Sequence, residues 1–222
     1  MRPLIAALWQ SDAAFPSGAF AFSNGVEAAT AALPRFDRAA LAELIRTALA
    51  RRWASAEKLA MLRAFHADDL GQVCEVDAAY EAATLCEPLR LGSRRNGRAF
   101  LTTHRRLGSP GAVELEGEIA ASRALGHMAV AQGFVWRGLG LGAGEAIAAS
   151  AYIAASGMAN AAVRLGALGA LEAQAALADA LGDVERLAQA PFDLDEPLSS
   201  AALWLDVVSA RQSRAHLRLF AN

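Results

Sequence analysis

Lysine is almost absent from this 222-residue sequence: of its 21 basic residues all but Lys58 are arginine. A nucleotide-binding P-loop needs a lysine directly after a glycine-rich turn, whereas Lys58 follows Glu57 inside a helical pattern. The glycines at positions 138, 140, 142 and 144 do not have the GxGxxG spacing of a dinucleotide-binding fold. A GxSxG nucleophile elbow is also missing. We therefore predict no catalytic residue and no tightly bound cofactor, and an enzyme is the weaker class of hypothesis.

Cysteine is scarce as well. The two cysteines, Cys74 and Cys86, do not form a CxxC pair. On a single helix they would lie roughly 120° apart around the axis, so they could not form a disulfide within it. We expect two ordinary thiols in a reducing cytoplasm.

The four histidines do not make a metal site by themselves. None is spaced three or four residues from another histidine, cysteine or carboxylate in a recognised ligand arrangement. His127 lies in the apolar stretch LGHMAVAQGF and is a weak candidate ligand. A histidine in that setting is more often part of hydrogen-bonded packing. No dedicated metal site is expected within one chain, whereas a site shared between subunits stays open.

Charges of the two signs nearly cancel. A net charge of −2 gives no electrostatic footprint for nucleic acid or for an acidic membrane surface, so neither is a predicted partner. The preference for arginine reflects either genomic base composition or contacts with carboxylates and phosphates at interfaces. The uncharged run between Glu145 and Arg164 approaches the length of a membrane span. Because alanine, serine and glycine dominate it, we interpret it as a helix buried on nearly all sides.

Alanine and helical spacing define the expected fold. Hydrophobic residues make up 55% of the chain, and many of them are alanine, the best helix former. Apolar residues recur at helical intervals, without a convincing strand pattern, repeat or long linker. We predict one all-α domain over residues 1–222, a bundle of roughly eight helices around the central Ala/Gly/Ser-rich helix. Residues 206–222 are predicted to become ordered only on a partner, because such terminal segments fray alone.

Polar residues mark where several helices begin. Asn24 is expected to cap a helix, with Glu27 completing a capping box. Asp37 is expected to cap the next helix, and Asp68 or Asp69 the one after it.

Two longer apolar patterns predict continuous helices. One covers residues 38–65 and would turn Arg51, Glu57 and Lys58 toward water. The other covers residues 114–135.

The segment 9–29, WQSDAAFPSGAFAFSNGVEAA, gathers aromatic side chains where regular structure is difficult to form. Phe15, Phe20 and Phe22 lie within eight positions, interrupted by a proline and by glycines that permit tight turns. Two interpretations stay open: the rings fold back onto their own helices, or they are buried partly against another chain.

The stretch 90–112, RLGSRRNGRAFLTTHRRLGSPGA, is the most basic part of the chain, with six arginines. It is either a solvated helix with loop ends or a docking surface for an acidic partner.

Four blocks together resemble the urease accessory protein F family. SDAAFPSGAFAFSNGVEAA is similar to its opening signature, and GHMAVAQGFVWRGLGL to its Gly-His block. AASGMANAAVRLGALG and the ending DVVSARQSRAHLRLF resemble two further blocks, in the same order and at similar separations. Departures such as Ala167, where a proline is common, and His216, where a tyrosine is usual, concern partner contacts more than the family.

The resemblance implies an all-helical, non-enzymatic protein of the cytoplasm that acts in urease maturation. Such proteins dimerise and bind a second accessory protein, called D or H, and the pair recruits the GTPase accessory protein G. The assembly, and not the single chain, would handle nickel and deliver it to apo-urease. Regulation of GTP hydrolysis and passage of nickel through an internal tunnel are further suggestions made for the family.

The expected partner interface combines the Phe-rich segment, the basic stretch and the tail. Arg211, Arg214 and Arg218 would share one face of a helix because three and four residues separate them. The full set that we predict at the interface is Phe15, Pro16, Gly18, Phe20, Phe22, Ser23, Gly25, Glu27, Arg94, Arg95, Arg98, Arg164, Ser209, Arg211, Arg214, Arg218 and Phe220.

Two rival functions remain at this point. A small-molecule enzyme would use a cavity beside the buried helix and turn over a substrate without partners, with an acid–base pair that we do not find in the sequence. A metal-carrying protein would bind nickel stoichiometrically and lose it on substitution of His127 or His104.

Overall fold

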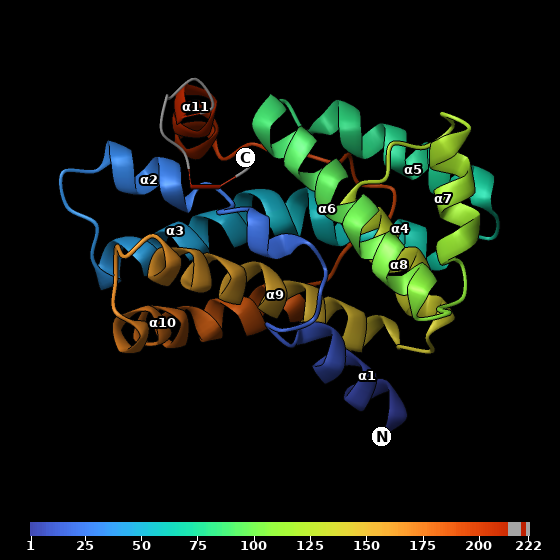
Figure 1. Ribbon diagram of the computed structural model, residues 1–222, viewed down its shortest axis with the longest axis horizontal. Coiled ribbons are helices and arrows are strands. Elements are labelled where there is room, and N and C mark those ends of the chain that lie inside the picture. The colour runs from blue at the N-terminus through green and yellow to red at the C-terminus, as the bar shows by residue number, and fades with distance from the viewer. Residues whose placement is uncertain (213–218, 221–222) are drawn as a thin grey trace.

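The computed structural model describes residues 1–212 and 219–220, and within these ranges the chain is helical without a β-strand (Figure 1). This confirms the prediction of an all-α bundle. The elements are α1 (Arg2–Ser11), the short 3-10 helix η1 (Ala19–Ala21), α2 (Val26–Ala32), α3 (Arg38–Ala48), the π-helix η2 (Leu49–Glu57), α4 (Lys58–His66), α5 (Leu70–Ala83), α6 (Glu87–Arg106), α7 (Ala112–Ala120), α8 (Met128–Gly138), α9 (Ala143–Arg164), α10 (Ala170–Gln189) and α11 (Leu203–Gln212).

Helix α9 is the predicted central helix. It packs against α10, α1, α2, α3 and α4, and seven of its alanines are buried, because the small side chains allow its neighbours to approach closely. By length and composition alone this helix could cross a membrane, yet 56% of its apolar window is buried inside the molecule. Such burial is what the core helix of a helical bundle shows.

Helix α8 lies between α4 and α6, and glycines set both crossings. At Gly133 an added Cβ would overlap the carbonyl oxygen of Met61 in α4. At Gly97 in α6 it would overlap the backbone at Gly126, just before α8. The helices therefore meet backbone to backbone, at a distance that any larger residue would increase.

Aspartates cap two helices as predicted, whereas Asn24 does not. The Asp37 carboxylate accepts a hydrogen bond from Ala40 N at 3.1 Å, and Asp69 accepts one from Gln72 N at 2.9 Å. At α2 the cap is Gly25, with no side-chain bond, and Asn24 itself has a left-handed φ of 53°. The capping box fails because the turn 23–25 follows the packing of this loop on the rest of the molecule.

The predicted helix 38–65 is continuous, but its middle is wound as the π-helix η2. A π-helix has more residues per turn than an α-helix, so the side chains that follow are rotated from the positions that α-helical spacing predicts. Arg51 is exposed as expected. The prediction was wrong for Lys58, which is 2% exposed, and for Glu57, which lines an internal cavity.

Lys58 has a structural role that its predicted position did not suggest. Its Nζ donates to the carbonyl oxygens of Leu187 at 3.1 Å and Ala190 at 3.3 Å, at the carboxyl end of α10. A cation there satisfies free carbonyl groups and complements the helix dipole.

The predicted helix 114–135 is two helices, α7 and α8. Between them the backbone turns at Ser122 and Gly126, both with positive φ. The Asp77 carboxylate of α5 then accepts hydrogen bonds from Gly126 N and His127 N, each at 2.9 Å. The break arises from this distant carboxylate, which periodicity cannot show.

Both cysteines are free thiols, as predicted. Burial raises the pKa of Cys74 and of Cys86, so neither is poised as a thiolate.

Candidate functional site

The Phe-rich segment divides into a buried and an exposed part. Phe22 is 7% exposed and belongs to the core. Phe15 is half-buried, with its ring centroid 5.3 Å from both Trp9 and His104. Phe20 is 71% exposed. The two open interpretations therefore apply to different rings: two fold back onto the chain, and one is available to a partner.

The segment is fastened to α6 through its backbone. Thr103 Oγ1 donates to the carbonyl oxygen of Pro16 at 2.7 Å. Gly18 has a φ of 81°, as its predicted turn requires, and a Cβ there would meet the side chain of Ala99. The loop thus lies flat on α6, and Phe20 is carried on its outer side.

Arg164, at the end of α9, holds two aromatic rings. Its guanidinium carbon lies 3.2 Å from the ring centroid of Phe20 and 4.5 Å from that of Phe220, and it donates to the carbonyl oxygen of Phe20. Phe220 is 5% exposed. One arginine thereby links the loop, the central helix and the described end of the tail through cation–π contacts.

The last part of the opening signature is largely buried where α2 packs against α11. Ser23 and Glu27 are buried, and a Cβ at Gly25, whose φ is 91°, would overlap Leu205 of α11. The carboxylate of Glu27 accepts a hydrogen bond from Leu219 N at 2.7 Å. These residues join the chain to its own tail, and Ser209 is likewise buried at 3% exposure.

Arg94 is engaged inside the chain. It forms a two-pronged ion pair with Glu81 of α5, which Arg90 also approaches at 3.2 Å. The Nε2 of the fully buried His127 lies 2.8 Å from the same carboxylate. Burial lowers the pKa of His127, with Asp77 and Glu81 opposing the shift. His127 is therefore hydrogen-bonded packing in this fold, the simpler of its two interpretations.

Three other predicted arginines are exposed: Arg95 and Arg98 on α6, and Arg211 on α11. Arg98 Nε donates to the carbonyl oxygen of Leu125 at 3.2 Å. Arg214 and Arg218 lie outside the described residues. Contact of any of these with another chain stays a prediction.

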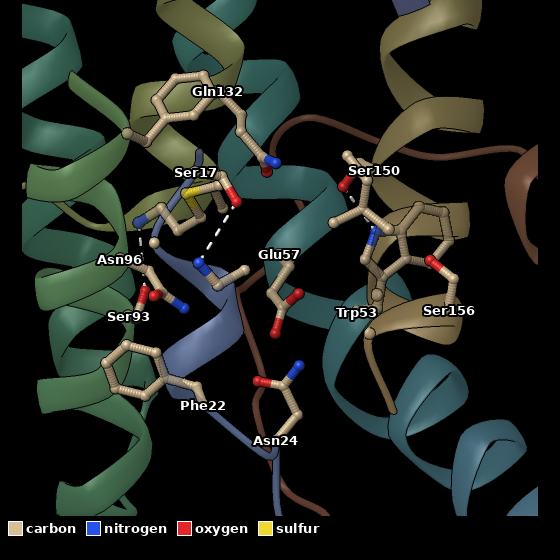
Figure 2. Close-up of a pocket in the computed structure, with 18 of the residues that line it drawn as sticks. Ser17, Phe22, Asn24, Trp53, Glu57, Ser93, Asn96, Gln132, Ser150 and Ser156 are labelled. Atoms are coloured by element: carbon tan, nitrogen blue, oxygen red, sulfur yellow. Dashed lines mark hydrogen bonds between the residues drawn. The ribbon is translucent and has the colours of Figure 1, made fainter. Parts of the chain in front are cut away.

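These elements surround a partly open cavity of about 420 Å³. The sequence suggested a cavity beside the buried helix only for the rival enzyme, and it did not indicate the lining. The walls of the cavity come from the loop 11–24, η2, α6, α8 and α9. Figure 2 shows Glu57 directed into this space, with its carboxylate toward Asn24 and with Ser93 and Asn96 on the helix beside it. Burial raises the pKa of Glu57, and the nearby charge of Arg52 opposes the shift. In the sequence Glu57 stands among the apolar residues Trp53, Ala56 and Leu59, and this was the available signal that its carboxylate could be buried. Only the π-helical winding of η2 determines that the side chain points into the cavity.

The described residues contain no group of three or more histidine, cysteine or carboxylate side chains placed to hold a metal ion. The described residues that line the cavity include two arginines, Arg164 and Arg52, whose Nη2 lies 2.7 Å from Asp206, but no histidine or cysteine. These features could support recognition through an exposed aromatic–arginine surface and through a largely apolar cavity that Glu57 enters.

Comparison with known proteins gives one consistent result. The UreF family model matches residues 36–181. Urease accessory protein UreF of Yersinia pestis (strain Pestoides F) is 30% identical over 225 residues, covering 99% of this chain and 98% of that protein. Urease accessory protein UreF 1 of Brucella melitensis biotype 1 is 29% identical over 231 residues, covering 95% of this chain and 89% of that protein. The similarity extends over nearly the full chain.

Proposed function

Because this chain belongs to the UreF family of urease accessory proteins, we propose that it is a non-enzymatic scaffold in the maturation of the urease nickel centre. In this role it binds the D/H accessory protein, and the pair recruits the GTPase accessory protein G and apo-urease in the cytoplasm. Nickel is handled by the assembly. The observation that carries the proposal is the family match over the central two-thirds of the chain, extended over nearly its full length by relatives named urease accessory protein.

The surface around Phe20 supports a scaffold function. Phe20 is a large exposed ring held in place by Arg164, and aromatic and arginine side chains are the residue types that dominate interface hot spots. Helix α11 continues the same region beside α2 and exposes Leu203, Trp204 and Val207. We propose this combined surface as the docking face for the D/H protein.

A second exposed apolar face supports self-association. Helix α1 presents Leu4, Ile5, Leu8 and Trp9, each at least 44% exposed, while its other side packs on α9. We propose that a homodimer or an accessory partner covers this face.

Co-expression with the D/H and G accessory proteins, followed by size-exclusion chromatography, tests the proposal. The wild-type chain should co-elute with its partners. Phe20→Ala should weaken binding of the D/H protein at least tenfold, since loss of a hot-spot ring costs about 2 kcal/mol or more. Leu171→Ala is the matched control, because Leu171 is also a large exposed apolar side chain but belongs to α10.

A truncation before Ser209 adds the tail to this test. It should reduce recovery of the GTPase in a pull-down. Because the truncation also removes the internal contacts of Phe220, the charge-reversal variant Arg211→Glu accompanies it. Undiminished recovery by both variants, together with full binding by Phe20→Ala, would refute the proposed docking face.

A further inference from the structure

The partly open cavity beside η2 is large enough to hold more than a few ordered waters. Its volume of about 420 Å³ falls within the range of small-molecule sites, roughly 300–1,000 Å³. Aromatic rings form much of the wall, with Phe22, Trp53, Phe100 and Trp136 among them. Side chains with oxygen and nitrogen atoms converge between these rings (Figure 2).

Glu57 is the charged group in the lining whose carboxylate has no hydrogen bond from the described part of the chain. The other charged lining residues each have contacts. Arg52 forms an ion pair with Asp206, and Arg164 makes cation–π contacts with Phe20 and Phe220. Asp12 accepts a hydrogen bond from Ala14 N at 2.7 Å. Burial also raises the pKa of Glu57, with Arg52 as the opposing charge. A negative charge in this position is costly unless a cation or donor accompanies it.

A further polar atom beside the cavity also lacks a partner. Asn96 Oδ1 is buried and accepts no hydrogen bond from the residues described. In folded proteins nearly all such atoms are paired, so this oxygen and the Glu57 carboxylate together favour an occupant that donates hydrogen bonds.

We propose that this cavity binds a small organic monocation, a primary ammonium or amidinium group on a short carbon skeleton, with Glu57 as its counter-ion. An ammonium group donates up to three hydrogen bonds, which Glu57 and Asn96 Oδ1 can accept. Trp53 and Phe22 also line the cavity, and aromatic rings attract a cation that reaches their faces. A transition metal fits less well, since the lining offers no imidazole or thiolate. This inference does not depend on the proposed scaffold function.

Trp53 and Trp136 line the cavity, so tryptophan emission of the full-length chain reports its occupancy. Propylammonium chloride is the probe, 1-propanol its neutral counterpart, and sodium chloride the control for ionic strength. We expect a saturable emission change and a rise in Tm with propylammonium, and neither effect with 1-propanol or with sodium chloride. Binding to Glu57→Gln should be at least tenfold weaker, whereas Glu43→Gln, which changes a carboxylate on the surface of α3, should bind as the wild type does.

Three results would overturn the proposal: no saturable response to propylammonium, an equal response to 1-propanol, or unchanged affinity in Glu57→Gln. The first would indicate that the cavity takes no small organic cation, the second that binding needs no positive charge, and the third that Glu57 is not the counter-ion. If Glu57→Gln does not fold, Ser156→Phe gives the same answer, because it introduces a ring into the cavity without changing any charge. Retained affinity in that variant would likewise place the probe elsewhere and refute the site.

Discussion

His104 is the centre of a buried network that joins α1, α6 and α8. Trp136 Nε1 can only donate, and it donates to Gln10 Oε1 at 3.0 Å. His104 Nε2 lies 3.1 Å from the same oxygen, so this nitrogen must carry the hydrogen. Ser109 Oγ, 2.8 Å from Nδ1, then donates to the other ring nitrogen. The histidine is held neutral, and burial lowers its pKa to about 4.

This network predicts acid sensitivity. An unfolded histidine has a pKa near 6.5, so below that pH the unfolded chain takes up a proton that native His104 refuses. The contribution of neutral His104 to the free energy of unfolding is fully present above pH 6.5 and is lost as the pH falls toward 4. From pH 7 to pH 5 the free energy of unfolding should drop by about 2 kcal/mol from His104, measured by urea denaturation.

The variant His104→Gln should lose that part of the pH dependence, although it is less stable at every pH. His66→Gln, at an exposed position of α4, should keep it. Equal pH slopes for wild type and His104→Gln would show that the ring does not titrate in this way.

Among the elements, η2 differs most from its sequence pattern. Its carbonyl oxygens at Ser55 and Arg51 accept hydrogen bonds from Ser199 N at 2.9 Å and Ala201 N at 3.1 Å, in the segment that precedes α11. A distant segment thus contacts the π-helical backbone along its length. We infer that this contact helps to hold the wider winding, and with it the direction of Glu57.

The close crossing of helices α4 and α8 can be tested by substituting the glycine at their contact. Gly133→Ala should lower the free energy of unfolding by about 1–3 kcal/mol, because the new Cβ overlaps the Met61 carbonyl and forces the helices apart. Thermal and urea unfolding measure the loss.

Gly182→Ala is the matched control, at an exposed position inside α10 where an added Cβ meets nothing within 4 Å. It should raise stability by about 0.5–1 kcal/mol, since alanine costs less backbone entropy in a helix. Similar effects of the two substitutions would mean that close approach does not control this crossing.

For the whole molecule, we expect that nickel handling needs the partners. The described residues contain no group of three histidine, cysteine or carboxylate side chains placed to hold a metal ion, and His127 is buried against Glu81. In equilibrium dialysis the purified chain should therefore retain less than one nickel ion per chain, whereas the complex with the D/H and G proteins should retain nickel. Stoichiometric binding by the chain alone, lost in His127→Ala, would instead support the metal-carrying alternative.

The sequence by itself determined the helical class, the central Ala-rich helix and the caps at Asp37 and Asp69, because these depend on spacing and composition within one segment. It also indicated an aromatic opening with a surface function. It could not say that Phe22 is core and Phe20 is exposed, since neighbours from α6, α9 and the tail decide which ring is covered.

Only the tertiary structure decided the position of the charges. Arg94 meets Glu81, Lys58 caps α10 and Glu57 enters the cavity through contacts between segments that are distant in the sequence. A helical pattern records which residues share a face, but it does not record what that face meets. For this reason the sequence predicted the helices and the family, while the packing of loop, π-helix and tail created the cavity.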